Sequence, residues 1–184
     1  MELFIIFIFF LLIPGAWVIL QYNGLITLRN HIRESWSNID TELKRRYDLI
    51  PNLVGVVKGY AAHERDVLER VTQLRNKCAR NHGAVGAQAR DEKALVGALS
   101  RMLALAEAYP QLKAEKSFLR LQKELVHTED RIQAARRFFN GNVRDYRNKV
   151  EQFPSNLVAA MFGFRPEDFF DVDSSVREVP STRF

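Results

Sequence analysis

The sequence is poor in the residues that interrupt helices, form disulfides or bind metals. Its 184 residues include one cysteine, Cys78, with four histidines, six prolines and nine glycines. A lone cysteine excludes an internal disulfide and any zinc site made of several cysteines. No two histidines have the spacing of a zinc-binding pair. No segment repeats with a period of about 20–50 residues, which excludes a solenoid.

Motifs of the common catalytic and nucleotide-binding loops are also missing. The chain has no Gly-x-Ser-x-Gly, no Walker-type loop and no Gly-x-Gly-x-x-Gly. Cys78 lies on an apolar stripe, which is typical of a small core residue. We therefore predict no enzyme activity, no cofactor and no metal. One Glu-x-x-His step, Glu124 and His127, leaves a metal-dependent, di-iron-like enzyme as the alternative, although such sites use this step twice.

Charge is absent from the eighteen residues "LFIIFIFFLLIPGAWVIL". As a helix they would span roughly 27 Å, close to the hydrocarbon thickness of a bilayer. A cleaved signal peptide would need a basic start and a small-x-small cleavage site, and the run has neither. We therefore predict an uncleaved transmembrane anchor at residues 1–21, and its bilayer residues include Leu3, Phe4, Ile5, Phe9, Leu12, Trp17 and Leu20.

Cations follow this run, while its N-terminal flank is nearly neutral. Arg29 and Arg33 are the first of them, and Lys44 begins a group of three. By the positive-inside rule, this asymmetry places the C-terminal domain in the cytoplasm. The prediction is a single-pass membrane protein whose first partner is the lipid bilayer; the resemblance described below implies that this membrane is the bacterial cell (inner) membrane.

Beyond the anchor, apolar residues recur at intervals of three and four, as in amphipathic helices. The pattern predicts an all-α protein whose residues 22–152 form an antiparallel up-and-down four-helix bundle. The first helix continues through Leu43. The others cover Leu53 to Cys78, Leu95 to Ala106 and Phe118 to Val150. Glu64 is the one acidic residue on the apolar face of the second helix.

Three cations and a proline lie where the first helix should end. Proline removes a backbone donor and disfavours the helical conformation of the residue before it. We therefore predict a turn at Asp48–Asn52 in which Asp48 caps the second helix and the cations favour the negative end of the first helix dipole. A long kinked helical hairpin is the alternative. The residues of this helix-turn segment are Arg45, Arg46, Tyr47, Asp48, Pro51 and Asn52.

Two long stretches carry a family resemblance. "WSNIDTELKRRYDLIPNLVGVVKGYAAHE" resembles the signature region of the LemA family of bacterial membrane-anchored proteins. "AYPQLKAEKSFLRLQKELVHTEDRIQAARRFFNGNVRDYRNKVEQFPSNLVAAMFGF" is similar to its second signature. The resemblance implies one N-terminal anchor, an antiparallel helical bundle and a bacterial membrane. It implies no reaction.

Residues 153–184 form an acidic tail with a surplus of apolar side chains. Such a patch is unusual on a soluble monomer, so it favours contact with the chain's own bundle, a second copy or the membrane surface. The candidate contact residues in the first helix and the tail are Leu25, Leu28, Ile32, Trp36, Phe153, Leu157, Met161, Phe162, Phe164, Phe169 and Phe170.

Taken together, these patterns predict a membrane-anchored, non-catalytic scaffold or adaptor. It self-associates as a homo-oligomer and binds an unidentified membrane protein. A regulatory subunit of a membrane protease is a further alternative. Nucleic acid is not a predicted partner despite the net charge of +5, because the arginines from Arg65 to Arg80 recur at every fifth position and spiral around their helix.

Overall fold

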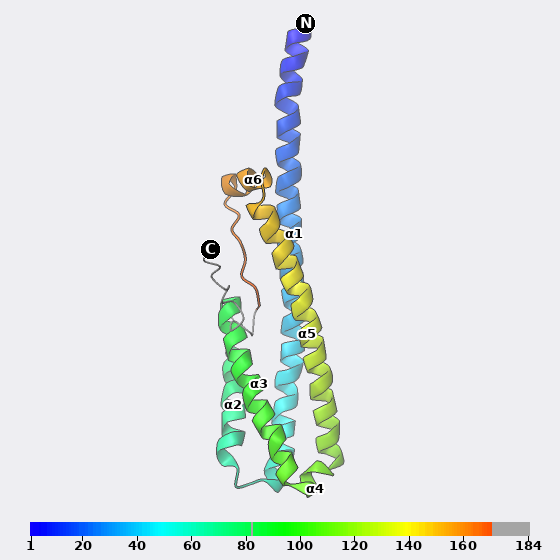
Figure 1. The fold of residues 1–184 in the computed structure, drawn as a ribbon, viewed down its shortest axis with the longest axis vertical. Helices are drawn as coiled ribbons and strands as arrows, with labels where there is room; N and C mark the ends of the chain where they lie inside the picture. The colour runs from blue at the N-terminus through cyan, green and yellow to red at the C-terminus, as the bar shows by residue number, and fades with distance from the viewer. Residues whose placement is uncertain (82, 171–184) are drawn as a thin grey trace, which may run out of the picture. The chain divides into compact units, whose positions relative to one another are not determined.

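The computed structural model describes the backbone of residues 1–81 and 83–170, and the side chains of residues 1, 12–81 and 83–170. The helices are α1 (Glu2–Tyr60), α2 (Arg65–Arg80), α3 (Val85–Ala108), α4 (Pro110–Lys113), α5 (Lys116–Glu151) and α6 (Ser155–Met161) (Figure 1). No strand occurs in these ranges. The predicted all-α class is confirmed.

Helix α1 runs without interruption for 59 residues and passes through Pro51. The predicted turn at Asp48–Asn52 is therefore wrong. Of the alternative, a long kinked helical hairpin, the structure bears out the helix that continues through the proline. The chain turns later, at residues 61–64, before α2 begins at Arg65. Asp48 and Asn52 are exposed residues within a helix, so neither caps one.

A long-range hydrogen bond accounts for the uninterrupted helix. Pro51 has no N–H to donate to the carbonyl of Tyr47, four residues earlier. The Arg75 side chain of α2 replaces this donor, because its Nε donates to the Tyr47 carbonyl oxygen at 3.0 Å. The carbonyl that the proline leaves unpaired in α1 is thus satisfied from a neighbouring helix.

The chain divides into two compact units, and the first comprises Met1–Asn38 and Ala135–Asp168. In this unit the early part of α1 packs along the end of α5. Asn142 Nδ2 donates to the carbonyl oxygen of His31 at 3.3 Å, and the Trp36 and Phe139 rings lie 5.4 Å apart. The buried apolar side chains include Leu25, Ile32, Phe139, Val143 and Tyr146.

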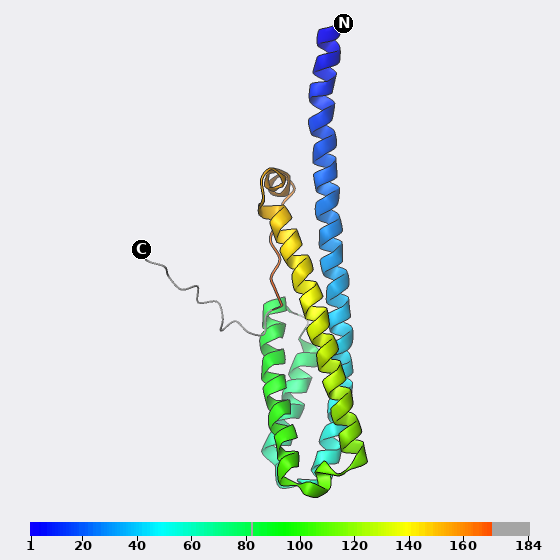
Figure 2. The same cartoon turned by 45° about the vertical axis from the view of Figure 1, so that its right-hand side comes forward.

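The second unit comprises Ile39–Ala134 and, among the described residues, Phe169 and Phe170. Within it, the end of α1, α2, α3 and the start of α5 lie side by side in alternating directions (Figures 1 and 2). The short α4 joins α3 to α5. Helix α3 begins at Val85, earlier than the predicted Leu95. Residues 81–84 alone separate it from α2. The core side chains include Leu43, Leu53, Val57, Val71, Leu95, Met102, Phe118 and Leu125.

The predicted anchor falls partly outside the described side chains, which do not include those of Leu3, Phe4, Ile5 and Phe9. Within the part of the chain whose side chains are placed, no helix combines the length and the apolarity that crossing a membrane requires. Leu12 and Leu20 are exposed, and Trp17 is half-buried.

Candidate functional site

Two charged side chains are almost completely buried in the second unit. Arg46 of α1 is 1% exposed and Glu92 of α3 is 2% exposed. The Arg46 guanidinium donates to Glu92 through Nη2 and to Glu129 of α5 through Nη1, the latter at 2.5 Å. The Tyr47 hydroxyl donates to the other oxygen of Glu92. We call Arg46, Tyr47, Glu92 and Glu129 the Arg46 cluster; it joins α1 to both α3 and α5.

The electrostatics of the cluster follow from its burial. Burial alone would lower the pKa of Arg46, but the negative charges of Glu92 and Glu129 outweigh it and raise that pKa. Burial raises the pKa of Glu92 against the opposing effect of Arg46. Burial and the charge of Glu92 also raise the pKa of Tyr47. At neutral pH the arginine is therefore charged and the phenol protonated.

Cys78 lies beside this cluster and is buried, as its place on the apolar stripe predicted. Burial, with the charge of Glu92 as the second cause, raises the pKa of its thiol to about 12. A thiol in this environment remains protonated at neutral pH and is a poor nucleophile. The cluster thus pairs ions and joins helices, but it supplies no activated nucleophile.

The sequence interpretation of the basic segment needs correction. Arg45 and Arg46 do not face the end of a helix dipole, because α1 continues beyond them. Arg45 is exposed and pairs with Glu42 one turn away, with Nη1 3.3 Å from the carboxylate. Further along α5, Glu129 pairs with Arg46, and Arg131 Nη1 lies 4.0 Å from the Glu42 carboxylate.

Sequence reasoning missed Glu92 and chose Glu64 as the acidic residue within an apolar stripe. Glu64 is only half-buried and occupies the N-cap position of α2. A usable pattern did exist for Glu92, which lies three and four residues from its buried neighbours Ala89, Gln88 and Leu95 on α3. The predicted third helix begins only at Leu95 and therefore excludes Glu92 from this periodicity.

A second feature, in the first unit, is an aromatic cluster between α1 and α6. The Tyr22 ring meets the Phe162 ring at 4.9 Å and the Phe164 ring at 5.6 Å, both edge to face. The guanidinium of Arg29 lies 5.3 Å from the centre of the Phe164 ring. Phe164 is held there by the turn that ends α6, in which Gly163 has a φ of 71°.

That turn is a Schellman motif. The Phe164 N–H donates to the Ala159 carbonyl at 2.9 Å and the Gly163 N–H donates to the Ala160 carbonyl at 3.3 Å. The start of α6 is fixed as well, because the Ser155 hydroxyl donates to the Lys149 carbonyl of α5 at 2.7 Å. Both ends of α6 are thus fixed by hydrogen bonds.

The candidate contact residues fall into two classes. Leu25, Ile32, Phe164 and Phe170 are buried within the chain, and Leu28, Trp36 and Phe169 are half-buried. The exposed members all lie in or beside α6, and they are Phe153, Leu157, Met161 and Phe162.

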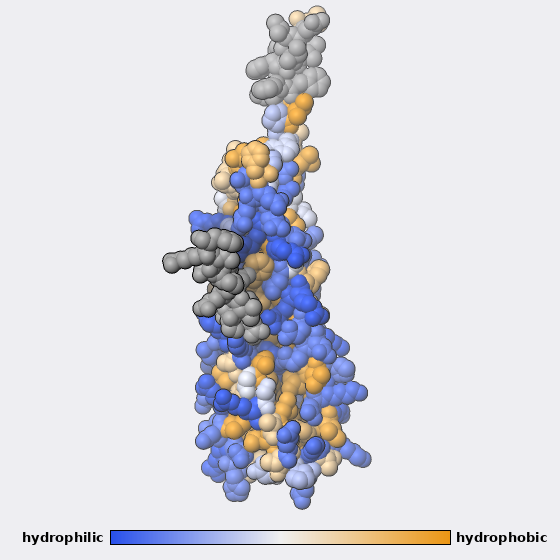
Figure 3. Space-filling view, in the orientation of Figure 1, coloured by the Kyte–Doolittle hydropathy of each residue, from blue (hydrophilic) through white to orange (hydrophobic). Residues whose placement is uncertain are grey.

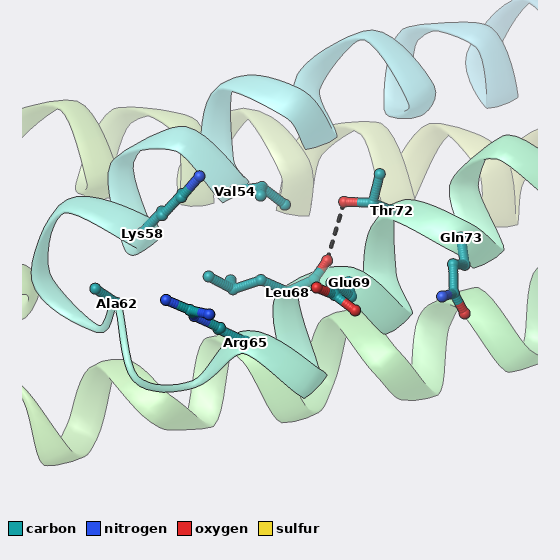
Figure 4. Close-up of a pocket in the computed structure, with 8 residues that line it drawn as sticks. All are labelled: Val54, Lys58, Ala62, Arg65, Leu68, Glu69, Thr72 and Gln73. Atoms are coloured by element: carbon teal, nitrogen blue, oxygen red, sulfur yellow. Dashed lines mark hydrogen bonds between the residues drawn. The ribbon is translucent and has the colours of Figure 1, made fainter.

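An open groove of about 550 Å³ lies where α1 turns into α2. Figure 4 shows its lining, which includes Lys58 from α1, with Arg65 and Leu68 from α2. The Thr72 hydroxyl donates to the Leu68 carbonyl at 2.9 Å and is therefore already engaged with its own helix. This lining offers no nucleophile beside a base.

The residues of the di-iron alternative do not form a metal site in this structure. Glu124 and His127 are both exposed on α5. Among the residues that the structure describes, no group of three or more histidine, cysteine, aspartate or glutamate side chains could hold a metal ion. The half-motif is therefore not completed from another helix within those residues.

Comparison with known proteins identifies relatives over most of the chain. The model of the LemA family matches residues 35–184. Magnetosome protein MamQ of Magnetospirillum gryphiswaldense is 25% identical over 178 residues, covering 83% of this chain and 65% of MamQ. Magnetosome protein MamQ 2 of Paramagnetospirillum magneticum is 25% identical over 180 residues, covering 84% of this chain and 66% of MamQ 2. Protein LemA of Metamycoplasma hominis is 28% identical over 186 residues, covering 95% of this chain and 84% of that protein. The chain thus spans slightly less than two thirds of the MamQ proteins.

Proposed function

The chain belongs to the LemA family, and we propose that it is a membrane-tethered, non-catalytic scaffold or adaptor. One observation carries this proposal: α1 is a single helix from Glu2 to Tyr60. The uncharged run from Leu3 to Leu20 and the first helix of the folded units therefore belong to one continuous helix. A partner that binds the folded part would therefore be tethered to the bilayer through this helix.

The relatives and the charge pattern support a bacterial membrane as the location. Two of the relatives are named as magnetosome proteins, and the LemA family to which the chain belongs was identified above as one of bacterial membrane-anchored proteins. We propose a single-pass anchor at residues 1–21 in the inner membrane. The first cations after the run, Arg29 and Arg33, favour a cytoplasmic C-terminal part.

The chemistry of the described residues supports a binding role over a catalytic one. The pKa of Cys78, about 12, keeps its thiol protonated. The charges of the Arg46 cluster are engaged with one another. Glu124 and His127 are both exposed. A regulatory subunit of a membrane protease is the alternative binding role.

We further propose that neighbouring copies self-associate. Confinement to one membrane raises the effective concentration of neighbouring chains, so weak contacts suffice. Because Leu25 and Ile32 are already buried within the chain, contacts along α1 would involve the half-buried Leu28 and Trp36. Native mass spectrometry of the full chain in mild detergent tests this, and a protein that stays monomeric in every detergent contradicts it.

The tether is tested by extraction of membranes with alkaline carbonate. The full chain should remain in the pellet. A Phe9→Arg/Leu12→Arg variant should be released, since each arginine costs about 2.5–3.5 kcal/mol at the centre of a spanning helix. A Phe9→Leu/Leu12→Ile variant is the matched control and should remain. Release of the unaltered chain would contradict the tether.

The adaptor role is tested by crosslinking in native membranes followed by mass spectrometry. We expect a defined membrane protein, recovered with the full chain and lost with the double-arginine variant. Metal analysis of the purified protein tests the di-iron alternative. About two equivalents of iron or manganese per chain would support the di-iron enzyme instead.

A further inference from the structure

We propose that the exposed face of α6, together with Phe153, is a second membrane contact that lies in the headgroup region of the bilayer. This inference rests on the proposed tether, because it requires the run before Tyr22 to be inserted. It assigns a lipid surface, and not a second protein, to the exposed apolar side chains in and beside α6.

Helix α6 has one face in the protein and one face outside it. Val158 and Ala159 are each 1% exposed, whereas Leu157 is 57% and Met161 is 71% exposed. Leu157 and Met161 are one helical turn apart and therefore point the same way. Phe153, at 79%, and Phe162, at 50%, flank this face. Figure 3 shows apolar side chains gathered over α6.

The position of α6 relative to α1 fits a membrane surface. Phe162 and Phe164 both contact Tyr22, which lies two residues beyond the end of the apolar run at Leu20. Tyrosine at this depth is typical of the interfacial belt of membrane proteins. In Figure 1 α6 lies beside α1 with its axis at a steep angle to that helix, and Figure 2 shows α6 nearly end-on. If α1 crosses the bilayer, α6 therefore lies along its surface, as interfacial helices do.

Cations outnumber acidic side chains in the first unit as a whole, although residues 151–168 contain three acidic residues and one arginine. Residues 21–38 and 135–168 contain eight arginine or lysine side chains and five aspartate or glutamate side chains. Arg29 stacks on Phe164, and the amino end of Lys149 lies against Gly24, where an added Cβ would be 3.6 Å from its Nζ. Cations close to an anionic leaflet attract it by about 1 kcal/mol each. Arg29 and Lys149 thus place two cations where α6 and the end of α5 meet α1, and apolar surface with nearby cations is what an anionic lipid surface binds.

The test uses the full chain with Cys78→Ala and one new cysteine labelled with an environment-sensitive fluorophore. Met161→Cys and Leu157→Cys report on α6. Phe138→Cys is the matched control, because Phe138 is 61% exposed in the same unit. It lies 13 residues before α5 ends at Glu151, about 20 Å along the helix axis. The proteins are reconstituted in phosphatidylcholine–phosphatidylglycerol vesicles whose acyl chains carry bromine near the headgroup.

We expect the brominated lipid to quench the labels at 161 and 157 and to leave the label at 138 bright. Unquenched labels at 161 and 157, on protein that resists carbonate extraction, would overturn the α6 contact while leaving the tether intact. Release of the protein itself would overturn both. Labels quenched only by a spin-labelled second copy would assign this face to self-association and overturn the lipid contact. Far-ultraviolet circular dichroism of each variant confirms that the helices are formed.

Discussion

Arg75 should stabilise the protein because of Pro51, although the two residues belong to different helices. The Arg75 Nε donates at 3.0 Å to the Tyr47 carbonyl, which the proline leaves without a helical donor. Arg75→Met removes the donor and keeps most of the apolar stem. A hydrogen bond from a charged group contributes about 1.5–3 kcal/mol. Because Arg75 is half-buried, we expect a loss near 1.5 kcal/mol, at the lower end of that range.

The proline itself provides the second arm of a double-mutant cycle. Pro51→Ala supplies an N–H that can donate to the Tyr47 carbonyl, and it removes the steric clash of the ring. We expect it to stabilise α1, by at most about 3 kcal/mol, the cost of proline inside a helix. In this background the Tyr47 carbonyl no longer depends on Arg75. Arg75→Met should then cost about 1 kcal/mol less than it does beside Pro51.

The measurement is urea unfolding of the purified full chain in mild detergent, followed by circular dichroism at 222 nm. Arg70→Met is the control, since Arg70 is an exposed arginine on the same helix and should change stability by less than about 0.5 kcal/mol. If the effects of Arg75→Met and Pro51→Ala add within about 0.3–0.5 kcal/mol, the explanation of the uninterrupted helix is refuted.

Three further predictions concern the Arg46 cluster and its neighbour. Arg46→Met should destabilise the protein by about 3–5 kcal/mol in urea unfolding, because it leaves Glu92 and Glu129 without their cation; adding Glu92→Leu and Glu129→Leu should restore most of the loss. The raised pKa of Glu92 means that the folded state holds its proton more tightly than the unfolded state, so this residue makes stability fall as pH rises from 4.5 through the folded pKa. Glu92→Gln should remove this contribution to the pH dependence of the free energy of unfolding. An unchanged pH dependence would contradict a raised pKa for Glu92. Cys78 should resist thiol reagents at pH 8, where a pKa of about 12 leaves roughly one thiol in ten thousand ionised, and it should react fully in urea.

The features that local periodicity determines could be predicted from the sequence. The helix predicted from Phe118 to Val150 corresponds to α5, Lys116–Glu151. Its apolar stripe repeats every three or four residues without interruption by proline. The burial of Cys78 followed from the same periodicity on α2. One amphipathic helix contains all the information that these two predictions require.

The features that depend on partners far along the chain could not be predicted. The donor that satisfies the carbonyl before Pro51 is 28 residues from it in sequence. Local rules for proline therefore indicated a turn. Arg46 and Glu92 are 46 residues apart, and in isolation each resembles an ordinary surface charge. Their pairing depends on which faces of α1 and α3 meet, and that is a property of the packed helices.

The Arg46 cluster determines something that the apolar stripes leave open. Apolar side chains repeat on every turn, so sliding α3 or α5 along α1 by one turn, about 5.4 Å, would still bring apolar faces together. The same slide would separate the Arg46 guanidinium from Glu92 or Glu129 and leave a buried charge unpaired, which costs several kcal/mol. A single arginine bound to two helices therefore fixes the register of three. Fixed register gives a scaffold the same surface in every copy, and this use needs no reactive group in the cluster.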